Sequence, residues 1–394
     1  MNFIVFKGSI ETLEFFSKQI ANELVERGHT VFFFDLSNDL FSMKNLVSFC
    51  NMSDVPPILI TFNHMGLSDE TIFLDKNGAS FFDEFNIPCV NIIVDHPLYY
   101  HQVMKNIPKK YVQICIDEEH TQYMKRFYPN VAVADTMYLA GTSIKEPLLP
   151  ISERKYDISF CGNYTPPEKF IKHFDRLSAE YRDFYMSILE TMKLNPSITL
   201  TKALSDAIYK SLGPVSDKDL DEAMANMIYA DLYTRFYFRG EVIKSLSDYD
   251  LKVHVFGKGW EDLKCLHPEN IISHGSVKTY ECLRAASNSK LSINVMPWFK
   301  NSCHDRVFSC IMNESVLVTD HSDFIDNYFV DDSNIILYGL DNIKLLPKRL
   351  SELLLDEARL QDIATRGFNL CIDTQNWSVR TDYILFVINK FFNI

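Results

Sequence analysis

The sequence predicts an α/β protein made of two doubly wound, Rossmann-like domains, the second of which carries a helical insertion. Three observations support this prediction. The chain has 394 residues, which is enough for two domains of ordinary size. Short and uniformly apolar runs alternate with stretches of helical spacing, as expected for parallel strands that helices cover on both faces. A polar run at about residues 141–155, punctuated by Pro147 and Pro150, separates two such series.

The first domain is expected over residues 1–150. An apolar run at 2–7, a helical pattern at 11–27 that ends at Gly28, and a second apolar run at 30–36 together form a strand–helix–strand unit. The same pattern predicts further strands at 57–62, 88–94 and 111–116, a helix at 118–127 and a last short strand near 131–134.

The second domain is expected over residues 151–375. Its strands are predicted at 156–160, 251–256, 290–295 and 315–319, and residues 341–371 have an almost continuous helical pattern. About ninety residues separate the first two of these strands, far more than a crossover needs. We therefore predict a helical insertion at about 165–247, with helical stretches at 167–194, 201–212 and 217–247. The segment 376–394 is expected to form a C-terminal helix that packs back across the domain junction.

Composition excludes several classes of function. The formal net charge is −13, and no stripe of Lys or Arg offers the basic face that a nucleic-acid backbone or an anionic membrane requires. The nine Cys form no C-x-x-C pair, which is typical of reduced thiols in a cytoplasmic protein rather than of a disulfide or zinc framework. No apolar stretch is long enough for a transmembrane segment.

Candidate ligand-binding residues follow the strands of the second domain, because open α/β sheets bind ligands at the carboxyl ends of their strands. A glycine at such a position lets a phosphate or a ribose approach the backbone, although a simple turn explains any single one of them equally well. The candidates are Gly162, Asn163, Gly257, Lys258, Gly259, Trp260, Pro297 and Asp320.

The segment 302–308, SCHDRVF, is the most informative of these sites. It follows the strand predicted at 290–295 and opens the helix that leads to the next strand. Arg306, with His304 beside it, is placed to hold a diphosphate, since a guanidinium donates two parallel hydrogen bonds to phosphate oxygens. The alternative is an ordinary surface arginine.

The corresponding positions of the first domain hold two histidines. Asp95 and His96 follow the strand at 88–94, and His64 follows the strand at 57–62. We expect these side chains to contact sugar hydroxyls, or to act as a base if the reaction inverts configuration. The competing interpretation is a buried structural histidine. None of these residues has the spacing of a metal site, so no metal is predicted.

Four blocks of the sequence, in this order and spacing, resemble the CgeB-like glycosyltransferases, GT-B proteins related to the retaining group 1 glycosyltransferases. The blocks are YDISFCGNY, DLYTRFYFRGEVIKSL with LKVHVFGKGW, HGSVKTYECLRAASNSKLSINVMP, and HDRVFSCIMNESVLVTD, within about 156–320. The resemblance implies a GT-B fold and a nucleotide-diphosphate sugar, linked to UDP, GDP or TDP, held by the second domain. Arg239, in the second block, joins the donor-site candidates.

The sequence departs from the family pattern at three positions. Ser309 stands where a Glu usually holds the donor ribose, so it is the candidate for that contact here. Glu314 stands in place of the usual Gly before the next strand, and Asn301 stands in place of another Glu. These departures put the ribose contact in doubt.

The function expected from the resemblance is glycosyl transfer of the hexosyltransferase type, retaining and metal-independent, to a protein such as flagellin, another surface protein or a glycan. No cofactor is expected beyond the sugar nucleotide. The alternative is an inactive GT-B protein that binds sugar nucleotide or assists an active transferase. A structural interaction protein built on the helical insertion is a third possibility, and it predicts no nucleotide binding.

Overall fold

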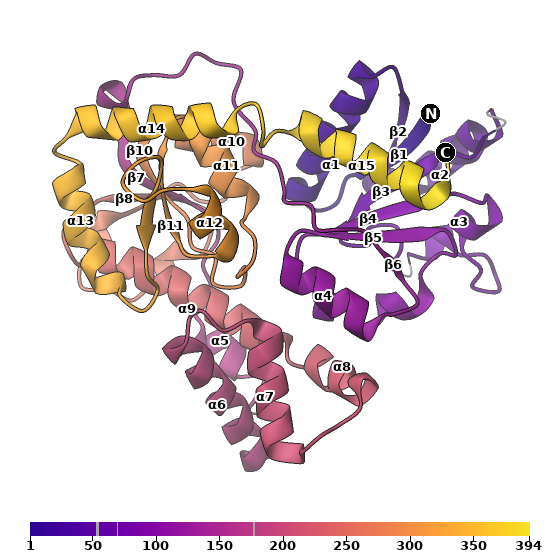
Figure 1. The fold of residues 1–394 in the computed structure, drawn as a ribbon, viewed down its shortest axis with the longest axis horizontal. Helices are drawn as coiled ribbons and strands as arrows, with labels where there is room; N and C mark the ends of the chain where they lie inside the picture. Colours follow the sequence, from indigo (N-terminus) through magenta and orange to yellow (C-terminus); the bar gives the residue numbers. More distant parts are fainter. Residues whose placement is uncertain (53–54, 69, 176–177) are drawn as a thin grey trace. The chain divides into compact units, whose positions relative to one another are not determined.

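The computed structural model describes residues 1–52, 55–68, 70–175 and 178–394 and divides the chain into two compact units. The first unit comprises Met1–Tyr138, Asp217–Ala225 and Trp377–Ile394. The second comprises Leu139–Ser216 and Asn226–Asn376. Each unit contains one six-stranded sheet whose paired strands are all parallel, flanked by helices (Figure 1). The prediction of two doubly wound α/β domains is therefore confirmed.

The sheet of the first unit has the strand order β2-β1-β3-β4-β5-β6. The strands are β1 (Asn2–Lys7), β2 (Thr30–Asp35), β3 (Ile58–Phe62), β4 (Cys89–Ile93), β5 (Tyr111–Cys115) and β6 (Ala132–Val133). The helices are α1 (Glu11–Glu26), α2 (Asp39–Asn51), α3 (Phe81–Glu84), α4 (Glu118–Phe127), α8 (Asp217–Ala225) and α15 (Trp377–Phe392). Strands β3, β4 and β5 are buried at every residue, which is why their sequences are mainly apolar and do not alternate. Their buried polar side chains, Thr61, Asn91 and Gln113, are hydrogen-bonded.

The sheet of the second unit has the order β12-β11-β10-β7-β8-β9. The strands are β7 (Tyr156–Cys161), β8 (Val253–Phe256), β9 (Ile271–Ser273), β10 (Ser289–Ile293), β11 (Val316–Asp320) and β12 (Ile336–Tyr338). The helices are α5 (Glu168–Ile171), α6 (Ala179–Leu194), α7 (Leu200–Leu212), α9 (Ile228–Ser247), α10 (Thr279–Ser287), α11 (Asp305–Ile311), α12 (Asp323–Tyr328), α13 (Leu346–Leu353) and α14 (Glu357–Cys371). The three-residue strands β9 and β12 were not predicted, because runs this short carry no periodicity.

The C-terminal helix α15 belongs to the first unit, although almost all of the preceding 150 residues belong to the second. It packs against α1, where the rings of Trp377 and Phe16 meet at a tilt of 39° with centroids 5.3 Å apart. The Arg27 guanidinium donates to the Asp382 carboxylate and to the Ser378 carbonyl. Apolar burial and charge-assisted hydrogen bonds together hold α15 in place.

The segment between Leu139 and β7, where the polar linker was expected, lies along the second unit. The Gly141 amide donates to the Gln375 carbonyl at 2.8 Å, and the Ile144 amide donates to the Asn313 side chain at 2.9 Å. A Cβ on Gly141 would lie 2.6 Å from Phe308 Cβ, so this close approach requires glycine. Within the described ranges, no helix is both long and apolar enough to cross a membrane.

Candidate functional site

Hydrogen bonds between backbone and side-chain groups join the loop that follows β7 to the loop that follows β8. Trp260 Nε1 donates to the Gly162 carbonyl at 2.9 Å, and the Lys258 amide donates to Asn163 Oδ1 at 3.0 Å. A Cβ on Gly257 would lie only 2.2 Å from the Gly162 oxygen. Gly257 is thus explained by close packing of the two loops, and Trp260, which is 2 % exposed, by packing in the core.

Two arginines converge on the ring of Phe160 at the end of β7. The Arg239 guanidinium lies 5.6 Å from the ring centroid and that of Arg306 lies 5.2 Å from it. Arg239 donates to the Asn163 carbonyl at 2.6 Å, and Arg306 donates to Asn294 Oδ1 at 3.1 Å. Among the described residues, neither guanidinium has a carboxylate within ion-pair distance.

Arg239 is the more unusual of the two arginines. It is 7 % exposed, and its Nε atom has no hydrogen-bond partner in the described part of the chain. Burial, with the charges of Arg306 and Arg235, holds the pKa of this guanidinium well below its usual range. A buried cation without a counter-charge is costly, so the arrangement favours an anionic ligand at this place.

The helix α11 presents the other candidates of the SCHDRVF segment. His304 caps α11, because its Nδ1 accepts a hydrogen bond from the Arg306 amide at 3.2 Å. Burial, opposed in part by the charge of Asp305, lowers the pKa of His304. Ser309 Oγ accepts a hydrogen bond from the Thr142 amide at 3.2 Å. Ser309 therefore fixes the segment that enters the second unit.

Asp320 and Glu314 both have structural explanations. Asp320 is 1 % exposed at the end of β11, and its Oδ1 accepts a hydrogen bond from the Met296 amide at 2.8 Å, which fixes the loop that leads to Pro297. Burial raises the pKa of Asp320 to about 6. Glu314 has a φ of 53°, the left-handed conformation that the glycine usual at this position adopts without strain.

In the first unit, the geometry of His64 matches the competing interpretation of a buried structural histidine. Its side chain is fully buried, and its Nε2 lies 2.9 Å from the hydroxyl of Tyr111. Burial lowers the pKa of His64 to about 3, so the ring stays neutral at physiological pH. Burial and the contact with Tyr111 give His64 a structural role in the first unit. Asp95 is partly buried and accepts a hydrogen bond from Asn63 at 3.1 Å.

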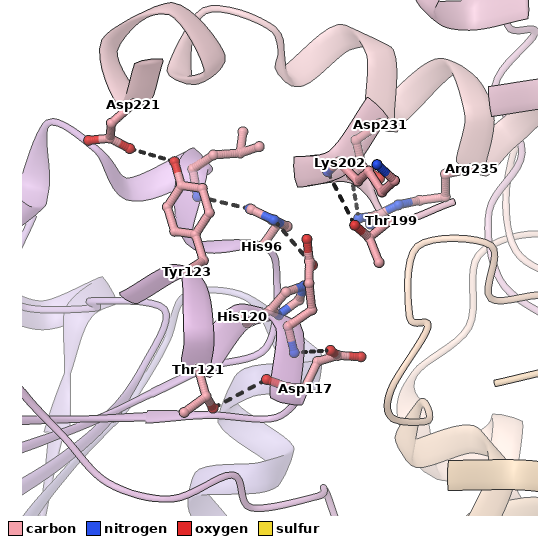
Figure 2. Close-up of polar contacts among 12 residues, drawn as sticks. His96, Asp117, His120, Thr121, Tyr123, Thr199, Lys202, Asp221, Asp231 and Arg235 are labelled. Carbon is pink, nitrogen blue, oxygen red and sulfur yellow. Dashed lines mark hydrogen bonds and ion pairs between the residues drawn. The ribbon is translucent and has the colours of Figure 1, made fainter. Parts of the chain in front are cut away.

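His96 lies in a cluster with Glu119 and His120 (Figure 2). His96 Nε2 lies 3.5 Å from Glu119 Oε2, and His120 Nε2 lies 3.8 Å from the same oxygen. Both histidines are buried, whereas the Glu119 side chain keeps 15 % exposure. Glu119 and His120 open α4 after β5, as His96 opens the 3₁₀ turn η3 (Pro97–Tyr100) after β4. Glu119 and His120 were not among the candidates predicted from the sequence, although they follow a predicted strand as His96 does.

The hydrogen bonds of His96 decide which chemistry this cluster can perform. Its Nδ1 accepts the Leu98 amide at 3.2 Å, so the proton of the neutral ring is on Nε2, the atom that faces Glu119. A metal ion would need the lone pair of that Nε2, and metal-bound histidines normally donate through their other nitrogen. In this tautomer His96 Nε2 faces the Glu119 carboxylate as a donor, which is unsuited to ligation of a metal ion by the same nitrogen.

Comparison with known proteins adds a family model and a group of structures. Residues 239–385 match the family model described as Glycosyl transferase-like. No curated protein sequence matches the chain significantly. An alpha-glucosyltransferase in complex with UDP and a 13-mer DNA containing a HMU base is 14 % identical, with a TM-score of 0.53 and 99 % of each chain covered.

Two further structures have a similar extent of match. Sucrose-phosphate synthase from Thermosynechococcus elongatus is 11 % identical, with a TM-score of 0.51, and the match covers 100 % of this chain and 99 % of that one. Anabaena Alr3699/HepE in complex with UDP-glucose is 9 % identical, with a TM-score of 0.52, and the match covers 99 % of this chain and all of that one. The chain therefore has the GT-B fold of these glycosyltransferase structures, as the sequence predicted.

Proposed function

We propose that the chain is a glycosyltransferase that takes a sugar from a nucleotide-diphosphate donor bound by the second unit. The pair Arg239 and Arg306 is the observation that carries this proposal. Two guanidiniums, for which the described residues offer no carboxylate within ion-pair distance, lie beside the loop that follows β7. A diphosphate supplies the missing negative charge and accepts charge-assisted hydrogen bonds from both.

The reaction also needs this pair of charges. As the bond between the anomeric carbon and the diphosphate oxygen breaks, negative charge grows on the departing nucleotide, and prearranged cations stabilise it. We propose that Arg239 and Arg306 take this part and that no metal ion is required. UDP is the nucleotide to test first, because two of the three similar structures contain UDP or UDP-glucose.

We assign the acceptor side to the first unit, at the cluster of His96, Glu119 and His120. With its Nδ1 occupied by a backbone amide, His96 is a hydrogen-bond donor and is poorly suited to be a base. Glu119 is the accessible acceptor of the cluster and can bind a hydroxyl of the sugar or of the acceptor. An arrangement without a free strong base suits retention of configuration, and we propose retention. The acceptor is a glycan or a protein, and the nine cysteines, none of which forms a disulfide, support a cytoplasmic site of action.

Binding of the nucleotide tests the proposal directly. UDP, GDP and TDP are titrated by calorimetry into the wild-type protein and into the variants Arg239→Met and Arg284→Ala. Arg284 lies on α10 of the same unit and is half exposed, so its substitution is the matched control. We expect at least one nucleotide to bind to the wild type and to the control, and to bind much more weakly to Arg239→Met. Equal affinity of all three proteins would refute the assignment.

A further inference from the structure

The helix α8 belongs to a different unit from the sequence on either side of it. It lies within the helical insertion, and the residues before Asp217 and after Ala225 are part of the second unit. Within the first unit, α8 contacts α4 and the turn η3. These are the two elements that carry His96, Glu119 and His120. The insertion thus supplies a helix to the unit that contains the candidate acceptor-side cluster.

A single buried carboxylate joins α8 to both elements. Asp221 is 5 % exposed, and its Oδ2 lies 2.7 Å from His101 Nδ1, just after η3. The hydroxyl of Tyr128, at the end of α4, donates to the same oxygen at 2.9 Å. The hydroxyl of Tyr123, within α4, donates to Oδ1 at 2.5 Å (Figure 2). Three donors from two elements therefore meet on one side chain of the insertion.

The two tyrosines that donate to Asp221 keep their hydroxyl protons. Burial, together with the charge of Asp221, raises the pKa of Tyr123 and of Tyr128 well above the usual range of a phenol. Both hydroxyls therefore stay protonated and donate. A second contact, between the Arg126 guanidinium and the Asp217 carboxylate at 2.6 Å, ties the first turn of α8 to α4 at the surface. Its side chains are about half exposed, so it contributes little, and Asp221 is the stronger anchor.

The network reaches the cluster through the ring of Tyr123. This ring meets the ring of His96 edge to face, with centroids 4.9 Å apart, and His96 in turn meets His120 at 4.7 Å. The position of the Tyr123 ring is set at its far end by the hydrogen bond to Asp221. A change at Asp221 is therefore transmitted to His96 by way of one packed ring.

We propose that Asp221 is a positioning residue, through which the helical insertion holds His96, Glu119 and His120 in their working arrangement. The proposal deepens the proposed function and rests on it for the role of the cluster. It gives the insertion a task beyond structure, because its helix α8 belongs to the first unit and contacts both elements that carry this cluster. Asp221 itself touches neither the sugar nor the nucleotide.

The test uses three variants of the full chain. Asp221→Asn keeps the shape of the side chain, but its amide nitrogen cannot accept a hydrogen bond. Tyr123→Phe keeps the ring against His96 and loses only the hydroxyl. Asp219→Asn is the matched control, since Asp219 is an exposed carboxylate on the same helix. UDP release from UDP-glucose, affinity for UDP, and the imidazole NMR signals of protein labelled at histidine are measured on each.

We expect Asp221→Asn to slow UDP release by about 10-fold or more, the effect of leaving buried donors without their acceptor. Tyr123→Phe should slow it in the same direction and should not add fully to Asp221→Asn in the double variant. The affinity for UDP should stay within about two-fold, because Arg239 and Arg306 belong to the second unit and donate to Asn163 and Asn294, not to α8. The His96 signals should shift in Asp221→Asn and Tyr123→Phe and remain in place in Asp219→Asn.

Unchanged His96 signals and an unchanged rate of UDP release in Tyr123→Phe would overturn the proposal, even if Asp221→Asn failed to fold. Loss of UDP affinity in parallel with the rate would overturn it too, because that pattern indicates general destabilisation. If the wild type bound no nucleotide and released no UDP, the proposed function would fail, whereas the NMR signals would still report whether Asp221 positions His96.

Discussion

Replacement of Arg306 by alanine isolates the contribution of one guanidinium to donor binding. In the ligand-free protein Arg306 makes one hydrogen bond to a side chain, that of Asn294, and it lies near a second cation, Arg239, whose pKa it helps to lower. Arg306→Ala removes this repulsion together with the hydrogen bond. The two effects oppose each other, so the melting temperature of the ligand-free protein should change little.

The effect on the complex should be much larger. Loss of a charge-assisted, bidentate contact to a diphosphate costs about 2–3 kcal/mol, which corresponds to a decrease in affinity of roughly 30–150-fold. At a nucleotide concentration of about 100 times the wild-type Kd, binding stabilises the wild type by about 2.7 kcal/mol. The same concentration should stabilise Arg306→Ala by less than about 1 kcal/mol.

Calorimetry gives the two affinities, and thermal unfolding with and without UDP gives the two stabilisations. Arg284→Ala is again the control. The reasoning is refuted if Arg306→Ala binds the nucleotide as tightly as the wild type. It is also refuted if the variant loses stability without ligand to the same extent as it loses affinity, because Arg306 would then be a structural residue.

Three other predictions concern the rest of the account. His96→Ala should reduce UDP release from UDP-glucose by about 10-fold or more, because the donor that faces Glu119 is lost. UDP affinity, measured by calorimetry, should stay nearly constant, since the nucleotide is assigned to the second unit; a loss of both would mark His96 as structural. Activity should survive EDTA, because arginines supply the positive charge at the diphosphate and the tautomer of His96 opposes metal ligation; a loss that Mg²⁺ or Mn²⁺ restores would contradict this. Burial raises the pKa of Asp320 from an ordinary 3.8 to about 6, so the folded protein favours the protonated side chain. This stabilises the fold fully below pH 3.8, and the stabilisation is lost as the pH rises through 6. One pKa unit corresponds to about 1.4 kcal/mol, so the free energy of unfolding of the wild type should fall by about 3 kcal/mol over this window relative to that of Asp320→Asn. Urea unfolding at pH 4 and pH 7.5 measures this difference. Parallel pH profiles of the two proteins would exclude a buried, protonated Asp320.

The fold was largely predictable because both sheets bury their strands on two faces. Continuous apolar runs such as residues 57–62 and 111–116 have few alternatives to a parallel strand, and the structure places β3 and β5 there. The membership of α8 was not predictable. Its sequence has the helical pattern of its neighbours, and no local pattern indicates that Asp221 forms hydrogen bonds with His101, Tyr123 and Tyr128.

The candidate site was predictable in part. A residue that directly follows a strand must lie at the carboxyl end of the sheet, but its position in the sequence does not determine where its side chain points. Arg306 and His96 were found in this way. His64 occupies an equivalent position, but its left-handed backbone, with a φ of 58°, and its contact with Tyr111 bury the ring. Ser309 was chosen by resemblance, and its bond to the Thr142 amide depends on a contact 167 residues away in the sequence.

The release of nucleotide from a sugar donor tests the central claim most directly. Purified wild-type protein is incubated with UDP-, GDP- and TDP-linked sugars, and the free nucleoside diphosphate is measured over time, with Arg306→Ala and Arg284→Ala treated in parallel. The account predicts release from at least one class of donor by the wild type and by Arg284→Ala, and a rate at least about 30-fold lower for Arg306→Ala. Release at the same rate by all three proteins, or by none of them, would contradict it.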